Sequence, residues 1–332
     1  AFEQFKSEFG KIYASAEEEA ERLKNFHVTL QLIEQRNKEE TGSATHGITK
    51  FADLSKAEFK AHYLNYVSPN ITKTPMIGAP KPLDLASTPS ADWTNTYTTP
   101  VKDQGYCGSC WAFSVTEQIE SDWMRTGDGS APVLSAQQVT SCTSYLLPFV
   151  GGCNGGQPEA GYEYAEDGLV LDSDYPYTSG KAGVTGECTA DLSEAVVKTT
   201  SYTNVCSNAR CEDTMGAYVS GTGPLSIVVD ASKWSTYTGG ILETCGTDLD
   251  HAVQVVGIDT DEESWKVRNS WGTSWGEAGF IRLAYGQNTC GLTSDANFAT
   301  VEAVKSLIGS DPATYSPNSM VGSDPATYSP NK

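Results

Sequence analysis

The sequence is poor in basic side chains, in histidine and in long apolar runs. Lysine and arginine together number 22 against 42 aspartates and glutamates, so the formal net charge is −20 at pH 7. Such a chain is repelled by phosphate backbones and anionic lipid headgroups, which argues against nucleic-acid and membrane partners. No apolar run is long enough to predict a membrane-spanning helix. The composition, 39% hydrophobic and 19% charged over 332 residues, is that of a globular protein.

Cysteine, by contrast, is plentiful. Nine cysteines stand against four methionines, a count more typical of an oxidising compartment than of the cytosol. We therefore expect the secretory pathway, with a lysosomal, vacuolar or extracellular destination. Their odd number leaves one thiol over if the others are bridged. All follow residue 106, at Cys107, Cys110, Cys142, Cys153, Cys188, Cys206, Cys211, Cys245 and Cys290.

The first 86 residues differ in charge from the remainder. They hold 11 basic and 12 acidic side chains, whereas residues 87–332 hold 11 and 30. An amphipathic helix is predicted from about Ala16 to Asn37, because one face repeats at steps of three or four residues. That face comprises Glu18, Arg22, Phe26, Thr29, Ile33 and Asn37.

Two segments lack the pattern of a folded element. The stretch between Pro69 and Pro89 is rich in proline and is expected to be an exposed linker. The tail repeats GSDPATYSPN at 309–318 and 322–331, with four prolines and almost no aliphatic side chain. We expect residues 305–332 to be disordered or an extended spacer.

After the linker, the pattern changes from helical to β along the chain. Apolar residues at helical spacing predict a helix from Cys110 to Arg125, stopped by Gly127. Four later runs, bounded by Gly, Asp and Asn, predict strands: Leu225–Val229, Ala252–Ile258, Trp265–Arg268 and Phe280–Leu283. Helices first and strands later indicate an α+β fold with two subdomains.

A nucleophile and a base stand out in this second part. Three of the four histidines, His27, His46 and His62, precede the linker, so His251 is the single imidazole in residues 87–332. Cys110 lies at the N-terminus of its predicted helix. A thiol there, beside an imidazolium, has a pKa well below the usual value of about 8.5 and is an effective nucleophile.

Four motifs in this order resemble the papain family of cysteine proteases, from about Thr88 to Val301. They are Gln104-Gly-Tyr-Cys-Gly-Ser-Cys110-Trp-Ala-Phe, Gly152-Cys-Asn-Gly-Gly156, Asp250-His251-Ala and Asn269-Ser-Trp-Gly272. The resemblance implies a papain-like fold, with a helical subdomain that supplies Cys110, a β-barrel-like subdomain that supplies His251, and the cleft between them. The resemblance also implies that the protein needs neither a metal nor another cofactor.

The N-terminal helix resembles the inhibitory propeptide of the cathepsin L-like branch of that family. The resemblance is carried by Glu18, Arg22, Phe26, Ile33 and Asn37, followed by Gly47, Phe51 and Asp53. Thr29 and Thr49 stand where the family usually has asparagine. The resemblance therefore implies that the chain is a zymogen. Its expected parts are a propeptide with its linker over 1–86, a peptidase domain over 87–304 and the tail over 305–332.

The resemblance also implies a role for each site residue. Cys110 would attack the peptide carbonyl, His251 would exchange the proton, and Asn269 would orient the imidazole. The side-chain amide of Gln104 and the backbone N–H of Cys110 would hold the oxyanion. Trp271 would shield the bond between His251 and Asn269 from water.

The expected substrate-binding residues are mostly small or apolar. Gly155 and Gly156 would let an extended substrate backbone lie close. The pocket for the side chain two residues before the cut favours Leu, Val or Phe, and Asp295 at its base could also pair with Arg or Lys. The full set is Gly108, Gly155, Gly156, Gln157, Pro158, Val228, Leu249, Asp250, Ala252, Trp271 and Asp295.

The resemblance pairs Cys107 with Cys153, Cys142 with Cys188 and Cys245 with Cys290. Arithmetic leaves Cys206 and Cys211 to close a small loop and Cys110 free. From the sequence alone, eight cysteines admit about 105 pairings.

Other interpretations remain open. Cys107-Gly-Ser-Cys110 is also the C-x-x-C of a thiol–disulfide oxidoreductase, although no βαβ pattern surrounds it. Together with Cys206 and Cys211 it resembles, weakly, a zinc site. A storage or binding protein on the same fold is a third possibility, but its signature would be loss of the nucleophile, base or oxyanion glutamine.

The remaining expectations concern activation and partners. Acid pH should release the propeptide by protonating carboxylates that hold it. No inserted histidine-rich loop occurs, so an endopeptidase is favoured over a carboxydipeptidase. Asn70, in Asn-Ile-Thr, is a candidate glycosylation site. Expected partners are peptide and protein substrates, the chain's own propeptide and cystatin-like inhibitors, and the protein is expected to be a monomer.

Overall fold

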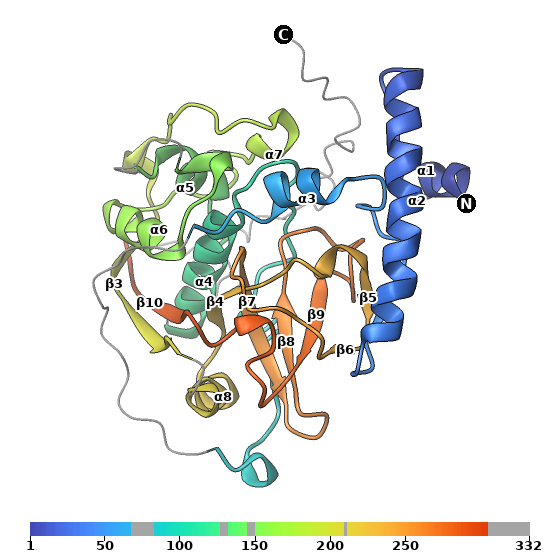
Figure 1. The fold of residues 1–332 in the computed structure, drawn as a ribbon. Helices are drawn as coiled ribbons and strands as arrows, with labels where there is room; N and C mark the ends of the chain where they lie inside the picture. Colours follow the sequence, from blue (N-terminus) through green and yellow to red (C-terminus); the bar gives the residue numbers. More distant parts are fainter. Residues whose placement is uncertain (68–82, 127–131, 145–149, 209–210, 305–332) are drawn as a thin grey trace.

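The computed structural model describes residues 1–67, 83–126, 132–144, 150–208 and 211–304. Helices and strands of the N-terminal segment precede two subdomains, one helical and one built around a sheet (Figure 1). Asn70, Gly127 and the repeats of the tail lie outside the described residues, so the predictions made for them are not addressed.

The N-terminal segment contains α1 (Phe2–Phe9), α2 (Ala16–Glu39), β1 (Thr45–His46) and α3 (Lys56–Tyr63). The predicted helix from Ala16 is confirmed and continues two residues beyond Asn37. Ser15 caps it by accepting a hydrogen bond from the backbone of Glu18, which satisfies one of the free N–H groups of the first turn. Phe26 on α2 and Phe5 on α1 are both buried, with ring centroids 5.1 Å apart, so the two helices share a small core.

The helical subdomain contains α4 (Cys110–Thr126), α5 (Ala136–Cys142), α6 (Pro158–Tyr164) and α7 (Ser179–Ala182). The predicted helix at Cys110 is confirmed and ends one residue beyond Arg125. Most of α4 is buried, including polar residues, because it lies between the other helices and the sheet. The hydroxyl of Ser114 on α4 donates to the carbonyl of Val253 on the sheet at 2.8 Å. This contact ties the two subdomains together directly behind Cys110.

The second subdomain is an eight-stranded sheet in the order β3–β10–β4–β7–β8–β9–β6, with β2 paired to β7. The four predicted strands are confirmed to within one residue as β4, β7, β8 and β9. The edge strand β3 and its neighbour β10 were not predicted individually, because their buried residues alternate irregularly. The strands are β2 (Ala91–Asp92), β3 (Val197–Cys206), β4 (Leu225–Val229), β6 (Ile241–Leu242), β7 (His251–Asp259), β8 (Ser264–Arg268), β9 (Phe280–Ala284) and β10 (Ala296–Ala303).

Shorter elements complete the fold. The helix α8 (Glu212–Gly221) packs beside the sheet, and β5 (Tyr237–Gly239) pairs with β1 of the N-terminal segment. Single 3₁₀ turns are Leu85–Ser87, Gly152–Asn154, Ala165–Asp167, Leu192–Glu194, Trp234–Thr236 and Thr289–Gly291. The β1–β5 pairing means that the N-terminal segment contributes a strand to the contact and does not simply lean on the sheet.

Buried charges cross the boundary between the subdomains. Lys102 pairs with Glu120 of α4, and Arg268 of β8 lies 3.4 Å from Glu117 of α4. All four side chains are at most 1% exposed. Ion pairs this deeply buried are strongly coupled to their partners, since removal of one would leave an uncompensated charge. They hold α4, and thus Cys110, in register with the sheet.

Four disulfides are present, and they are the pairs expected from the sequence: Cys107–Cys153, Cys142–Cys188, Cys206–Cys211 and Cys245–Cys290. Cys110 is the free cysteine. Because Cys107 is bonded to Cys153, it forms no redox pair with Cys110, and Cys206 and Cys211 are bonded to each other instead of binding zinc.

Candidate active site

Cys110 begins α4, so its thiol lies at the positive end of a 17-residue helix. The preceding turn is held by the Cys107–Cys153 disulfide and by a hydrogen bond from the N–H of Gly108 to the carbonyl of Cys153, at 3.1 Å. Two segments of the helical subdomain are thereby fixed to each other immediately beside the thiol.

His251 and Asn269 lie on neighbouring strands of the second subdomain. His251 starts β7, and Asn269 directly follows β8, which pairs antiparallel with β7. The imidazole Nε2 lies 2.8 Å from Oδ1 of Asn269. The backbone N–H of Ser270 donates to the same Oδ1, also at 2.8 Å, which leaves this oxygen facing the ring. The carboxamide therefore accepts from Nε2–H, and Nδ1 is the ring atom left to exchange a proton.

Trp271 covers the pair formed by His251 and Asn269. Its ring is fully buried and stacks on the imidazole of His251, with centroids 4.8 Å apart and an interplanar angle of 30°. Water is excluded from the hydrogen bond, which strengthens it.

Burial controls the ionisation of both reactive groups in this form of the protein. It raises the pKa of the Cys110 thiol to about 11, against smaller lowering effects of the backbone of Ala252, Asn65 and Trp111. It also lowers the pKa of His251 to about 4, opposed by the hydrogen bond with Asn269. Near neutral pH the structure therefore holds a neutral thiol and a neutral imidazole, not an ion pair.

Gln104 is oriented by two donors. Its Oε1 accepts from the hydroxyl of Ser270 at 2.8 Å and from the indole N–H of Trp271 at 3.2 Å. The amide nitrogen is thus turned the other way, where one hydrogen bonds the carbonyl of Cys107 at 2.9 Å. Its second hydrogen is available for a developing oxyanion next to Cys110.

The N-terminal segment enters the cleft beside Cys110. After α3, the N–H of Tyr66 donates to the carbonyl of Asp250 at 2.9 Å, and the N–H of Val67 donates to the carbonyl of Gly156 at 3.0 Å. Gly156 in turn donates to the carbonyl of Asn65 at 3.2 Å. A backbone ladder of this kind occupies the edge where an extended peptide would bind.

Gly155 shows why glycine is needed here. Its φ is +102°, and a Cβ at this position would lie 2.1 Å from the carbonyl oxygen of Asn65. Both the backbone conformation and the space therefore exclude other side chains.

Aromatic side chains of the N-terminal segment pack on Trp271. Phe51, Phe59 and Tyr63 approach its ring edge-on, with centroids 5.2, 5.3 and 6.2 Å away. All three are at most 5% exposed and belong to the main core of the sheet subdomain. The segment is therefore anchored next to the site by apolar burial.

The remaining motif residues make hydrogen bonds within this segment, except that Gly47, like the neighbouring Thr49, bonds to the sheet subdomain. Arg22 bonds Glu58 at 2.8 Å, and Asp53 accepts from Tyr13 at 3.0 Å. Glu18 Oε2 accepts from the N–H of Ala14, Ile33 is half-buried, and Asn37 makes two hydrogen bonds with the backbone of His46. Gly47 donates its N–H to Thr236, and Thr49 donates its hydroxyl to Ser235.

The expected pocket residues come from three elements. Val228 of β4 pairs with Ala252 of β7, and the N–H of Val228 donates to the carbonyl of Asp295 at 3.1 Å. Gln157 precedes α6, and Pro158 is its first residue. Leu249 packs near Gly291, and the pKa of Asp250 is raised to about 7 by burial.

Glu159 was missed by the sequence analysis. It is 3% exposed, and its carboxyl interacts electrostatically with that of Asp295. Burial, then the charge of Asp295, raises the pKa of Glu159 well above its usual range, and burial raises that of Asp295. One of the two therefore keeps a proton. An acid in the first turn of a helix is usually exposed, so no sequence signal marked it.

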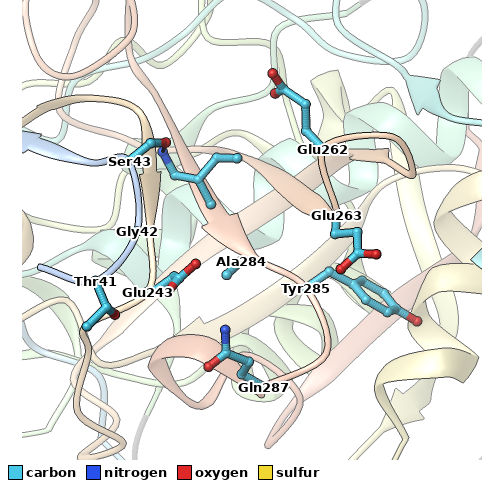
Figure 2. A pocket seen from close by; sticks show the side chains of 10 residues that line it. Thr41, Gly42, Ser43, Glu243, Glu262, Glu263, Ala284, Tyr285 and Gln287 are labelled. Carbon is cyan, nitrogen blue, oxygen red and sulfur yellow. Dashed lines mark hydrogen bonds between the residues drawn. The ribbon is translucent and has the colours of Figure 1, made fainter.

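A cavity of about 430 Å³ lies elsewhere, between the segment after α2 and the β6–β9 edge (Figure 2). Thr41, Gly42, Ser43 and Glu243 line one side, and Glu262 and Glu263 line the other. None of the predicted site residues lines it, so it is separate from the peptide cleft.

The fold and the site together define a cysteine protease held in an inhibited form, and comparisons with known proteins agree. The profile of papain family cysteine proteases matches residues 87–300, and that of the cathepsin propeptide inhibitor domain matches residues 2–59. The chain belongs to the papain family of cysteine proteases and carries its inhibitor domain.

Individual relatives cover nearly the whole chain. It is 38% identical to cysteine proteinase 2 of Leishmania pifanoi, over 88% of this chain and 67% of the relative. It is 36% identical to a probable cysteine protease of Arabidopsis thaliana, over 92% and 87%. The structure resembles digestive procathepsin L 3 of Tenebrio molitor, with a TM-score of 0.77 and 31% identity over 90% and 97% of the chains.

The disulfides indicate the kind of compartment in which the protein folds. Four disulfides indicate an oxidising environment, so the protein follows the secretory route. Across the described ranges, no helix is both long and apolar enough to cross a membrane.

Proposed function

We propose that this protein is an endopeptidase zymogen whose reaction uses Cys110, His251, Asn269 and Gln104. The observation that carries the proposal is the hydrogen bond between His251 and Asn269 under Trp271, in a site whose remaining cysteine is a free thiol at a helix N-terminus. The three groups have the residue types and the order of orienter, base and nucleophile that acyl transfer requires.

In the reaction, the thiol of Cys110 gives its proton to His251 Nδ1, and the thiolate attacks the peptide carbonyl carbon. The carbonyl oxygen becomes an oxyanion, stabilised by Nε2 of Gln104 and the N–H of Cys110. His251 then protonates the leaving amine as the C–N bond breaks, leaving a thioester. Water, deprotonated by His251, hydrolyses the thioester, and the thiol and a carboxylic acid are released.

The propeptide inhibits in two ways under this proposal. Its backbone at Asn65 to Val67 occupies the edge at Gly156, and its bulk keeps Cys110 and His251 dry and neutral. Removal of the segment re-admits water and favours the ion pair. Acidification should promote that removal, and cleavage should fall between residues 80 and 92, with the peptidase domain ending near residue 304.

Substrate preference should reflect the mixed pocket. Val228, Leu249 and Ala252 favour Leu, Val or Phe two residues before the cut, and Asp295 supports acceptance of Arg or Lys. The protein is expected to act as a monomer in a lysosome, a vacuole or the extracellular space. Cystatin-like inhibitors are expected partners.

The experiment is hydrolysis of a Phe-Arg fluorogenic peptide after incubation at pH 5 with a mild reductant, beside Cys110→Ala. Chain mass is followed in parallel. Activity should appear as roughly 9 kDa is lost, on the order of 110 Da per residue for residues 1–86, and should be absent from the variant. A processed chain with an intact thiol and no activity on any peptide would favour a binding or storage role instead.

A further inference from the structure

The propeptide meets the sheet subdomain through a polar contact far from the cleft. Arg36 of α2 is buried and donates to three uncharged oxygens there: the carbonyl of Ser232 at 2.9 Å, the hydroxyl of Ser235 at 3.1 Å and the hydroxyl of Thr236 at 2.8 Å. A guanidinium can only donate, so each of these oxygens accepts.

This contact determines the protonation of His46. Its Nδ1 lies 2.9 Å from the hydroxyl of Thr236, which already accepts from Arg36. The hydroxyl keeps one hydrogen and one further lone pair; donation of that hydrogen to Nδ1 satisfies both groups when Nδ1 carries a lone pair, and this is the arrangement that a neutral His46 allows. In the docked propeptide His46 is consequently neutral, with its hydrogen on Nε2.

The ring has no route to water while the propeptide is docked. His46 is 6% exposed, and β1, to which it belongs, pairs with β5. The side chain of Asn37 makes two hydrogen bonds with the backbone of His46: it donates to the carbonyl and accepts from the N–H, each at 2.8 Å. If His46 gains a proton, either the buried surroundings must stabilise its charge or the contact between the propeptide and the sheet subdomain must open.

The charges around His46 are mixed. Arg36 and Lys233 disfavour a second positive charge, with Glu39 close to Arg36. Glu40 favours it, but its Oε2 lies 4.0 Å from Nε2. Its Oε1 is already occupied by the N–H groups of Gly42, Glu243 and Thr244. Glu40 therefore compensates only part of the cost.

We propose that His46 is an acid-operated release switch of the propeptide. Protonation at Nδ1 makes the Thr236 hydroxyl accept from both Arg36 and His46, so that its own hydrogen loses the acceptor Nδ1, and brings a second cation beside Arg36. The docked state is weakened, and the propeptide leaves the sheet and then the cleft. The proposal rests on the proposed inhibitory function of this segment and adds a named trigger to it.

The sign follows from linkage. Burial, then the charge of Arg36, lowers the pKa of His46 to about 4, whereas a freed histidine titrates near 6.5. Docking is therefore fully favourable above about pH 6.5 and is lost as the pH falls toward 4. At pH 5 this one group should weaken docking on the order of 10-fold relative to pH 7.5.

The test compares full-length His46→Asn with wild type, because the Asn oxygen can accept from Thr236 at the place of Nδ1 without titrating. His27→Asn is the matched control, since His27 is an exposed histidine of the same segment, on α2. Self-processing is followed by mass from pH 4 to 7.5. We expect His46→Asn to process on the order of 10-fold more slowly at pH 5, and His27→Asn to match wild type.

The processed enzymes are identical in sequence, so their peptidase activity must be equal. A His46→Asn profile that superimposes on that of wild type overturns the switch, provided that its thermal midpoint at pH 7.5 is unchanged.

A second measurement applies even if the variant is unstable. In full-length Cys110→Ala carrying labelled histidine, NMR should show two of the four imidazoles titrating below pH 5, those of His251 and His46. Titration of His46 near 6.5, with His251 alone below pH 5, overturns the switch. The NMR measurement does not depend on proteolysis. If the processed wild type proved inactive, the proposed enzyme function would be wrong, but the titration of His46 would still test the switch.

Discussion

His251 Nε2 lies 2.8 Å from Oδ1 of Asn269, 18 residues later in the chain, and the indole of Trp271 stacks over the imidazole. Antiparallel pairing of β7 with β8 brings the two residues together, and the N–H of Ser270 fixes the oxygen. The orientation of the base is therefore a property of the sheet, and Cys110 is brought to it by packing of α4 on β7.

Replacement of Asn269 by Ala should leave His251 free to rotate. Because a small misplacement of a catalytic group costs about 10²-fold in rate, kcat/KM of the processed enzyme should fall by about that factor. Thiol titration with a disulfide reagent should still count one Cys110 per chain. Unchanged kcat/KM would contradict the orienting role.

Alkylation of Cys110 should differ between the two forms. With its pKa raised to about 11 by burial, the thiol of the proenzyme is almost entirely protonated at pH 7. Carboxymethylation at pH 7 should be at least about 10²-fold slower than in the processed enzyme, because the thiolate is the reactive species. The rate in the proenzyme should rise with pH up to the limit of its stability, and equal rates in both forms at pH 7 would rule out control by burial.

The carboxyl pair of Glu159 and Asp295 should make substrate preference depend on pH. Burial raises the pKa of both groups, so one proton is held at acid pH and lost as the pH rises. The ratio of kcat/KM for Arg over Leu, two residues before the cut, should therefore increase from pH 4.5 to 7.

Asp295→Ala should lower that ratio at both pH values, and Glu159→Gln should remove most of its pH dependence. No hydrolysis of Arg substrates, or an Arg rate unchanged in Asp295→Ala, would exclude the pair as a determinant.

Phe59→Ala should loosen the propeptide. The side chain is 5% exposed and packs 5.3 Å from Trp271, so its removal should cost about 3–5 kcal/mol of zymogen stability. Self-processing should then begin at a higher pH than in wild type. Ile12→Ala, at an exposed position of the same segment, is the control and should process normally.

The disulfides should differ in their contribution to stability. Cys206–Cys211 spans 5 residues and Cys142–Cys188 spans 46. Loop-closure entropy predicts about 2 kcal/mol for the short loop and about 4 kcal/mol for the long one. Paired serine variants in the Cys110→Ala background should reproduce this order in thermal unfolding, and a larger loss from the short loop would contradict it.

Much of the site could be predicted from the sequence because its chemistry is carried by short motifs. The free thiol of Cys110 at a helix start, the single histidine after the linker and the four cysteine pairs all followed from local patterns or from the resemblance that those patterns support. The strands β4, β7, β8 and β9 were found because each is a compact apolar run bounded by turn residues.

Other features could not be found in this way. Glu159 looks like an ordinary first-turn acid, and His46 looks like a surface histidine of a propeptide. Arg36, three residues after Ile33, looks like a solvated basic side chain of its helix, yet it is buried against residues about 200 positions away. Their environments depend on which distant surface covers them.

The sequence by itself determined the family, the types of many of its helices and strands, and the residues that we propose to react, with their order along the chain. Periodicity and motif spacing can be found in the sequence because they depend only on residues close together in the chain. Only the tertiary structure decided that Cys110 and His251 are buried, that Glu159 and Asp295 meet as a buried carboxyl pair with raised pKa values, and that burial beside Arg36 lowers the pKa of His46. Those states depend on desolvation and on hydrogen bonds between groups that meet only when the propeptide docks on the folded sheet.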